Sequence, residues 1–361
     1  MSRLVALLGR RDAPTDGLED YCTWLGRALL TRGHHFERIR VPWRDVGWLR
    51  ALWRLWPESA GWRSAWVLVQ YTAMSWSRWG FPLGLLAVLT ILRLRSCRIA
   101  VVFHDPAGVP GRRWIDRLRR TYQEWVMRRA HHWAERAVLN VPVDRATWLP
   151  LRRSKATCIP VGSNVPATPR RPERERTREQ KAKTVAVFSV TGGKSGHREV
   201  ADIAQAVSRA VEAVPCLRLV VMGRGSKEAE EALRRAVDGT KVELSVLGLL
   251  PAEDISRLLA EADVLLFVRG QFSTQRTSGI AGIACGLPVV GYAGPQTGPP
   301  LTEAGVTLVP QGNAEALADA LTRVLSDGNL WRRLHEQTVD AYRRYFAWEA
   351  IAERFMETLP L

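Results

Sequence analysis

The chain has 361 residues, 46% of them hydrophobic and 24% charged, which excludes a disordered protein and leaves room for two domains. The formal net charge of +16 is uneven, because residues 1–165 hold 27 basic against 12 acidic side chains and the remainder is nearly neutral. Thirteen of the 15 tryptophans also precede residue 150. This basic half predicts attraction to phosphate, on nucleic acid, anionic lipid or a lipid-linked pyrophosphate, and its tryptophans suit a membrane interface.

Three further features bear on cellular location. The five cysteines are odd in number and lack metal-ligand spacing, which predicts reduced thiols in an intracellular protein with no metal site. The first residues run directly into an apolar strand pattern, so no signal peptide is expected. The longest apolar run, Trp79–Leu94, is shorter than a membrane span and contains glycine and proline, so we interpret it as a buried helix.

Apolar runs alternate with helical periodicity through the first half. Strands are expected over residues 4–9, 35–41, 65–71, 98–104 and 137–140, and helices over 18–31, 44–56, 81–92 and 113–136. The segment Pro166–Lys183, rich in proline and then in alternating Arg and Glu, predicts a solvated linker.

The second half repeats the alternation. Strands are expected over residues 184–190, 217–222, 242–247, 264–268, 288–292 and 305–309, and helices over 200–214, 227–237, 252–260, 279–285, 314–326 and near the C-terminus. Strands that alternate with helices form parallel sheets, so the two halves predict two separate α/β sheets.

Four pieces of the second half carry a family resemblance. They are Val220-Val221-Met222-Gly223-Arg224-Gly225, Leu247-Gly248-Leu249-Leu250-Pro251-Ala252-Glu253, Leu258-Leu259-Ala260-Glu261-Ala262-Asp263-Val264 and Ala284-Cys285-Gly286-Leu287-Pro288-Val289-Val290. Their order resembles that of the retaining GT-B glycosyltransferases of glycosyltransferase family 4, also called glycosyl transferases group 1. The resemblance implies two Rossmann-like, doubly wound parallel-sheet domains facing a cleft, and sugar transfer from a nucleotide diphosphate sugar without a metal or other cofactor.

The same resemblance suggests where the domains begin and end. Ile159–Val165 resembles the turn that closes the family's first domain, and Tyr345–Glu349 resembles the start of its final helix. We therefore expect an acceptor-side domain over residues 1–165, a linker over 166–183, a nucleotide-sugar domain over 184–340 and a helix over 341–361 that crosses back.

Glycines and a helix start form the expected donor site. Gly223 and Gly225 allow a strand–helix turn to approach a ligand, and the backbone of Gly248, Leu249 and Leu250 offers hydrogen bonds to a nucleobase edge, although each glycine also suits an ordinary tight turn. The helix that opens at Thr277, Ser278 and Gly279 presents free N–H groups to a diphosphate, unless Ser278 serves only as an N-cap.

The sequence departs from the family where two glutamates are usual. Those positions are Ser273 and Ala281, so the contacts to donor sugar and ribose that the glutamates make are in doubt. One alternative is that polar neighbours take over. These are Arg269, Gln271, Ser273, Thr274 and Arg276. The others are a different handling of the donor and a catalytically inactive chain.

Cations are expected after the first strand of the second half. The loop Thr191–Glu199 contains Gly193, and its Lys194 and Arg198 fall near the family's two phosphate-binding cations, in swapped order. An exposed loop with ordinary charges is the alternative.

The first half offers its own candidates. Thr15-Asp16-Gly17 resembles the family's glycine loop, where Gly17 allows close approach of the donor or acceptor, and Asp16 is alternatively a helix N-cap. His104 and Asp105 end a buried strand, where α/β sheets keep their ligands, and the family has a histidine there that contacts the sugar.

The sequence thus predicts a glycosyltransferase in polysaccharide or glycolipid synthesis. Lys194, Arg198 and the helix start at Ser278–Gly279 are expected to stabilise the leaving diphosphate, and His104 and Gly17 to place the sugar. Asp16 and Asp105 are expected on the acceptor side. Its expected partners are a nucleotide sugar, a glycan or lipid-linked acceptor and an anionic membrane, with a cytoplasmic location at the inner face of that membrane. One rival is a non-catalytic GT-B-like binding protein. The other is a nucleic-acid-binding protein, which no recognised motif supports.

Overall fold

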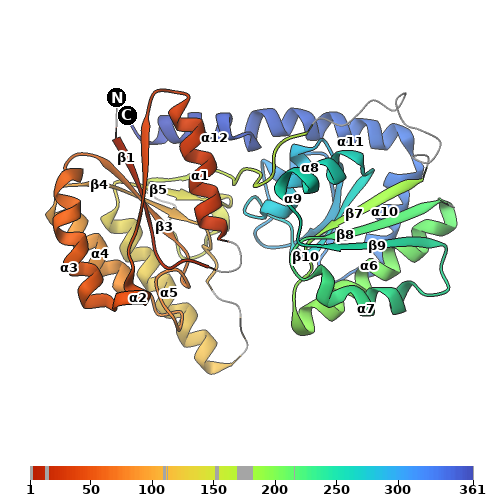
Figure 1. Cartoon of the computed structure of the whole chain (residues 1–361), viewed down its shortest axis with the longest axis horizontal. Coiled ribbons are helices and arrows are strands. Elements are labelled where there is room, and N and C mark those ends of the chain that lie inside the picture. Colours follow the sequence, from red (N-terminus) through yellow and green to blue (C-terminus); the bar gives the residue numbers. More distant parts are fainter. Residues whose placement is uncertain are drawn as a thin grey trace. The chain divides into compact units, whose positions relative to one another are not determined.

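The computed structural model of the chain describes residues 3–12, 16–108, 111, 113–150, 154–168, 182–214 and 216–360. It divides into two compact units, one of Met1–Pro160 with Trp348–Leu361 and one of Val161–Ala347. Each unit contains one six-stranded sheet with helices packed around it (Figure 1). The linker expected over 166–183 lies largely outside the described residues, since 169–181 are not among them.

Unit 1 is built on an all-parallel sheet with strand order β2-β1-β3-β4-β5-β6. The strands are β1 (Arg3–Leu8), β2 (His35–Arg40), β3 (Trp66–Tyr71), β4 (Arg98–Phe103), β5 (Arg136–Leu139) and β6 (Ala156–Cys158), and the helices are α1 (Gly17–Leu30), α2 (Trp43–Val46), α3 (Trp48–Glu58), α4 (Leu83–Leu94), α5 (Trp114–Trp133) and α12 (Trp348–Thr358). Because β1, β3 and β4 are almost wholly buried, their near-continuous apolar sequence is what a parallel sheet covered on both faces requires. Right-handed crossovers place α1 on one face, where it contacts α12, and α3, α4 and α5 on the other.

Unit 2 has the strand order β12-β11-β10-β7-β8-β9, again all parallel. The strands are β7 (Lys183–Phe188), β8 (Leu217–Met222), β9 (Val242–Gly248), β10 (Val264–Gln271), β11 (Val289–Ala293) and β12 (Val306–Pro310), and the helices are α6 (Gly193–Ala213), α7 (Ser226–Val237), α8 (Ala252–Glu261), α9 (Thr277–Ala284), α10 (Ala314–Ser326) and α11 (Gly328–Ala341). The strand order reverses between β7 and β10. In doubly wound sheets ligands bind outside the carboxyl ends of the strands at such a reversal.

The predicted fold class, two Rossmann-like doubly wound parallel sheets, is confirmed, and most strands agree with the expected ranges within two residues. Four helical expectations were wrong or incomplete. The helix expected over 44–56 is two helices separated at Gly47, whose φ of +79° interrupts the helix. The helix expected from residue 200 begins at Gly193, because Gly196 lets the first turn close against Thr191: a Cβ there would lie 2.0 Å from the Thr191 carbonyl oxygen.

The two remaining differences concern α11, which was not expected, and α4, which was expected to be buried. Only the inner face of α4 is buried, whereas Leu83 and Leu94 are exposed on its outer face. The short strand β6 was also not expected, since three residues give no periodicity to read. All five cysteines are free thiols.

Candidate functional site

The loop from β10 to α9 lies at the strand-order reversal of unit 2. The cap residue of α9 is Arg276, which makes no side-chain capping hydrogen bond, and the first turn of the helix contains no acidic residue. The alternative that Ser278 is only an N-cap is therefore wrong, because Ser278 lies inside the first turn. Gly279 permits close packing, since a Cβ there would lie 2.1 Å from the Phe272 ring. The positive end of the α9 dipole is left without a side-chain acceptor at its cap.

Arginines gather around this helix start. Burial, then the nearby Arg276, and more weakly Arg224, hold the pKa of the Arg269 guanidinium below its usual value, while Glu199 acts in the opposite direction. The buried Nε of Arg269 has no hydrogen-bond partner among the described residues. Arg276 and Arg224 act on Arg269 as like charges, so positive charge gathers here and would favour a bound anion.

Two more cations lie on α6, the helix that follows β7. Lys194 and Arg198 are exposed and one helical turn apart, so they share a face of α6. Gly192 and Gly193, at the start of that helix, have open space where a Cβ would be. The expectation of a charged loop here is corrected to a charged helix N-terminus, which adds its own dipole to the cationic side chains.

The glycines after β8 have a structural role. A Cβ on Gly225, at φ +77°, would lie 2.0 Å from the Val190 carbonyl oxygen, and one on Gly223 would lie 2.8 Å from the Ser189 hydroxyl. The Gly223 N–H donates to the Gly248 carbonyl at 2.7 Å, so these turns hold one another together. Beside them, Leu249 is 62% exposed at the end of β9, and Leu250 is half-buried.

The other predicted residues of the β10–α9 loop are mostly engaged within the protein. Ser273 and Thr274 are fully buried, and the Thr274 carbonyl accepts a hydrogen bond from Val161 N–H at 2.9 Å. Gln271 exchanges two hydrogen bonds with Gln296, at 2.7 and 3.1 Å. Ala281 is also fully buried. Ser273 and Ala281 therefore cannot present side chains to a ligand as exposed glutamates would.

Sequence reasoning missed Gln296 and Thr297. Thr297 Oγ1 donates to the Phe272 carbonyl at 2.6 Å, and Gln275 Nε2 donates to Gln296 Oε1 at 2.8 Å. Both residues thus fix the β10–α9 loop. The available signal was the turn Gly294–Gly298 directly after a buried strand, at the same sheet edge as the site.

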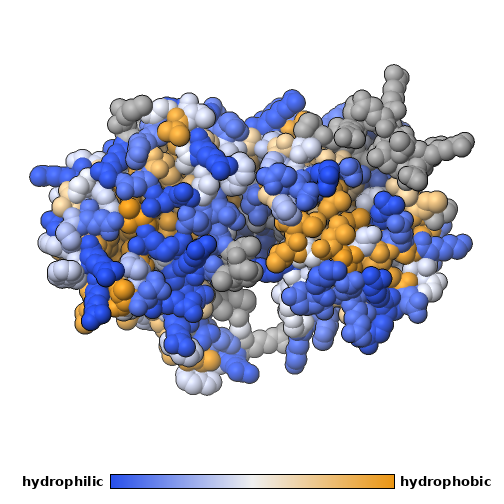
Figure 2. All heavy atoms as spheres, in the orientation of Figure 1, coloured by the Kyte–Doolittle hydropathy of each residue, from blue (hydrophilic) through white to orange (hydrophobic). Residues whose placement is uncertain are grey.

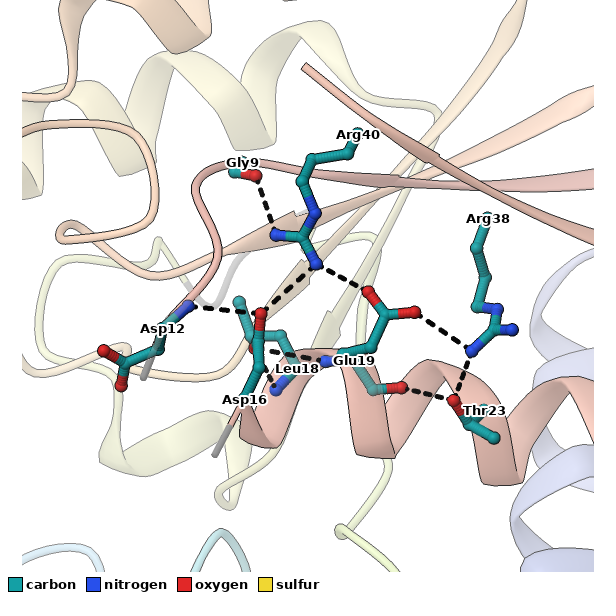
Figure 3. A network of polar contacts seen from close by, with 8 residues as sticks. All are labelled: Gly9, Asp12, Asp16, Leu18, Glu19, Thr23, Arg38 and Arg40. Carbon is teal, nitrogen blue, oxygen red and sulfur yellow. Dashed lines mark hydrogen bonds and ion pairs between the residues drawn. The ribbon is translucent and has the colours of Figure 1, made fainter. Parts of the chain in front are cut away.

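In unit 1, Asp16 is the N-cap of α1 and belongs to a closed polar network (Figure 3). Its Oδ1 accepts from Leu18 and Glu19 N–H at 3.1 and 3.2 Å, and its Oδ2 accepts from Arg40 at 3.2 Å. Arg40 also binds Glu19 at 2.5 Å and donates to the Gly9 carbonyl at 3.0 Å. The N-cap alternative for Asp16 is therefore correct. Gly17, the first residue of α1, is exposed, and none of the residues that the structure describes comes within 4 Å of its Cβ position. Thr15 lies outside the described residues.

His104 follows β4 and is held as a neutral imidazole. Its Nε2 lies 2.7 Å from Gln70 Oε1, and the Gln70 amide nitrogen donates to the Leu68 carbonyl at 3.2 Å. Because this orients the Gln70 oxygen toward His104, we assign the proton to Nε2, which leaves Nδ1 as an acceptor. Burial lowers the His104 pKa to about 3, and Tyr21 packs edge-on against the ring at 4.7 Å. The half-buried Asp105 is close enough to Tyr71 to raise its phenol pKa further, beyond the effect of burial.

The described residues contain no group of three or more His, Cys, Asp or Glu side chains that could hold a metal ion.

Comparison with known protein families gives a match within unit 2. Residues 185–327 match the family of glycosyl transferases group 1. A search of curated protein sequences gave no significant match.

Solved structures of similar fold cover nearly the whole chain. One is a sucrose-phosphate synthase from Thermosynechococcus elongatus, with a TM-score of 0.67 and 17% identity over 99% of this chain and 98% of that one. Another is Anabaena Alr3699/HepE in complex with UDP and glucose, with a TM-score of 0.66 and 14% identity over 100% of both chains. A glycosyltransferase from Rickettsia africae has a TM-score of 0.67 and 14% identity over 99% and 97%. At these identities the likeness establishes the GT-B fold.

Proposed function

We propose that this chain, whose residues 185–327 form a domain of the glycosyl transferases group 1 family, transfers a sugar from a nucleotide diphosphate sugar to an acceptor hydroxyl. The observation that carries the proposal is the arginine cluster of Arg224, Arg269 and Arg276 beside the start of α9. It combines guanidinium groups with a helix N-terminus at the strand-order reversal, and both features favour binding of a diphosphate.

The residues of the proposed site would have separate roles. Arg269 and Arg276, with Lys194 and Arg198 on α6, would stabilise the charge that develops on the leaving diphosphate. The exposed Leu249 would pack against the nucleobase. The neutral His104 would accept a hydrogen bond from a sugar hydroxyl through Nδ1, as a positioning contact rather than as an acid.

Uridine diphosphate is the first nucleotide to test, because Anabaena Alr3699/HepE was solved with UDP and glucose and with UDP-glucose. We further propose retention of anomeric configuration without a metal, as the family resemblance implies. The acceptor we propose is a glycan or a lipid-linked intermediate.

The test is calorimetric titration with UDP, GDP, ADP, CMP and dTDP, followed by thermal shift. A ligand that binds only the folded state stabilises it by about 2.7 kcal/mol at a hundredfold excess over its Kd. We expect one diphosphate to bind selectively and Arg269→Met to weaken it at least tenfold, since a hydrogen bond to a charged group contributes about 1.5–3 kcal/mol. The matched control is Arg332→Met on α11, which should bind as the wild type does.

The unliganded Arg269→Met protein should melt no lower than the wild type, because burial and the like charges of Arg276 and Arg224 disfavour the Arg269 cation more than Glu199 favours it. A lower melting temperature together with unchanged nucleotide binding would sink the proposal.

The burial of Ser273 and Ala281 favours one second candidate, a protein that binds the donor without turnover. Release of glucose from UDP-glucose, with and without glycan acceptors, separates the two functions. Binding without any release or transfer would establish the second.

A further inference from the structure

The outer face of the helical layer α3–α4–α5 in unit 1 carries large hydrophobic side chains that no described part of the chain covers. On α3, Leu49, Trp53 and Trp56 lie three and four residues apart, and Leu49 and Trp53 are 87% and 77% exposed. The residues that α3 buries in the core are Ala51 and Leu55, on a different side of the helix. The exposed stripe is therefore separate from the face that folds the protein.

Helix α5 repeats this arrangement. Trp114, Leu118 and Trp125 recur at helical spacing, and Trp114 is 76% exposed. The residues of α5 that pack into unit 1 include Val126, Met127 and Ala130. A second exposed apolar stripe thus lies on the same helical layer.

Contacts between the three helices make these stripes one surface. Gly84 at the start of α4 lies directly against Trp48 of α3, since a Cβ there would lie 2.2 Å from the indole ring. The segment before α4 is tied to α5 by Gln123 Nε2, which donates to the Gly80 carbonyl at 2.8 Å. Leu83 and Leu94 on α4 and Trp79 before it continue the exposed apolar surface between α3 and α5. Figure 2 shows hydrophobic residues interrupting the hydrophilic surface on the side of unit 1 where α3 and α4 lie.

The polar residues of this surface are mainly arginines. Residues 43–58, 76–95 and 114–133 together contain eleven arginines, no lysine and four carboxylates. Arg50 and Arg54 flank the α3 stripe, Arg95 stacks over Trp56 at 3.9 Å from the ring centroid, and Arg129 lies over Trp125 at 5.8 Å. Arginine binds phosphate groups in bidentate fashion and is less strongly hydrated than lysine.

We propose that the α3–α4–α5 face of unit 1 docks on an anionic lipid bilayer, with the tryptophans and leucines inserted at the headgroup level and the arginines on lipid phosphates. No helix of the described residues is long and apolar enough to cross a membrane, so the contact would lie in the interface plane. Charge complementarity distinguishes this occupant from a second copy of the chain, whose same face carries the same positive charge. The inference does not depend on the proposed transferase activity.

The experiment is co-sedimentation of the full chain with vesicles of phosphatidylcholine alone and of phosphatidylcholine with phosphatidylglycerol. We expect binding to the anionic vesicles only, weakened by salt. The stripe variants Leu49→Gln/Trp53→Gln and Trp114→Gln/Leu118→Gln should each bind at least about tenfold more weakly, since each removes two side chains that bury apolar area. Arg50→Gln/Arg54→Gln should weaken binding by about tenfold or more, because each arginine near an anionic surface contributes about fivefold.

Matched controls come from exposed residues elsewhere. Leu30→Gln/Leu247→Gln, on α1 and β9, and Arg332→Gln/Arg333→Gln, on α11, should bind as the wild type does. Thermal unfolding of each variant checks that it is folded, which is expected because the substituted side chains are exposed.

Four outcomes would overturn the proposal. The first is absence of vesicle binding. The second is that the wild type binds neutral and anionic vesicles equally well, and the third is that the stripe variants bind anionic vesicles as well as the wild type does. The fourth is a wild-type dimer in light scattering that becomes a monomer in the stripe variants, without any vesicle binding, which would assign the face to a second copy.

Discussion

The β1–α1 loop of unit 1 and the β10–α9 loop of unit 2 both lie at the carboxyl edge of a parallel sheet before a helix, yet their cap residues carry opposite charge. In unit 1, Asp16 caps α1 and, with Glu19, pairs with Arg40, so the positive charges are matched inside the protein. In unit 2, Arg276 occupies the cap position and lies close to Arg269. The chain caps the start of α1 with a carboxylate, whereas it places a guanidinium group at the start of α9, where positive charge suits an anionic ligand.

The largest effect is expected when the cap residue of α9 is changed to the aspartate that caps α1. Arg276→Asp should lower nucleotide affinity at least about a hundredfold, because a charged contact worth about 1.5–3 kcal/mol is replaced by repulsion. The unliganded protein should gain about 1 kcal/mol from the new N-cap. Titration calorimetry and thermal unfolding measure the two effects, and unchanged affinity would contradict the assignment of the anion site.

The next largest effect is expected on the pH dependence of the free energy of unfolding, because His104 is neutral in the folded protein. Since burial depresses its pKa to about 3, the unfolded state binds a proton near its ordinary pKa while the folded state does not. Stability should therefore fall as pH is lowered below about 6.5. Between about pH 7 and about pH 5, the wild type should lose about 1–2 kcal/mol more than His104→Gln. Identical pH dependence of unfolding in the two proteins would show that His104 titrates normally.

Removing the cap of α1 should have a smaller and purely structural effect. Asp16→Ala should lower the free energy of unfolding by about 1 kcal/mol, because two N–H groups of α1 lose their acceptor while Arg40 keeps Glu19 and the Gly9 carbonyl. Nucleotide affinity should not change. Urea unfolding and calorimetry test this, with Asp16→Asn as the control that keeps a capping oxygen. A loss of affinity without a loss of stability would make Asp16 a ligand contact.

The smallest effect is expected at Gly17. No atom of the described residues lies within 4 Å of its Cβ position. Gly17→Ala should therefore raise the free energy of unfolding by about 0.5 kcal/mol, because alanine lowers the conformational entropy of the unfolded chain. If the backbone of Gly17 approaches the donor or acceptor, the same variant should lower kcat/KM for transfer. Unchanged kcat/KM would remove Gly17 from the site.

The fold followed closely from the sequence. The buried strands β8 and β10 could be predicted because strands of a sheet covered on both faces have unbroken apolar runs. Such a run is visible in a few consecutive residues of the sequence. Helix α6 was predicted too short, because Gly192, Gly193 and Gly196 indicate a loop by local propensity. Only the close packing of Gly196 on Thr191 shows why a helix tolerates them.

The candidate site was predictable in place and less so in detail. The sequence by itself determined that polar and cationic residues follow the strands of two doubly wound sheets, because strand and helix patterns are local and fix which residues reach the carboxyl edge. It could not determine which of these side chains form hydrogen bonds and ion pairs within the protein. Tertiary contacts decided that Asp16 and Gln271 are engaged with Arg40 and Gln296, while Arg269 is buried near Arg276. Pairing of charges and burial depend on segments far apart in the chain, and only folding brings those together.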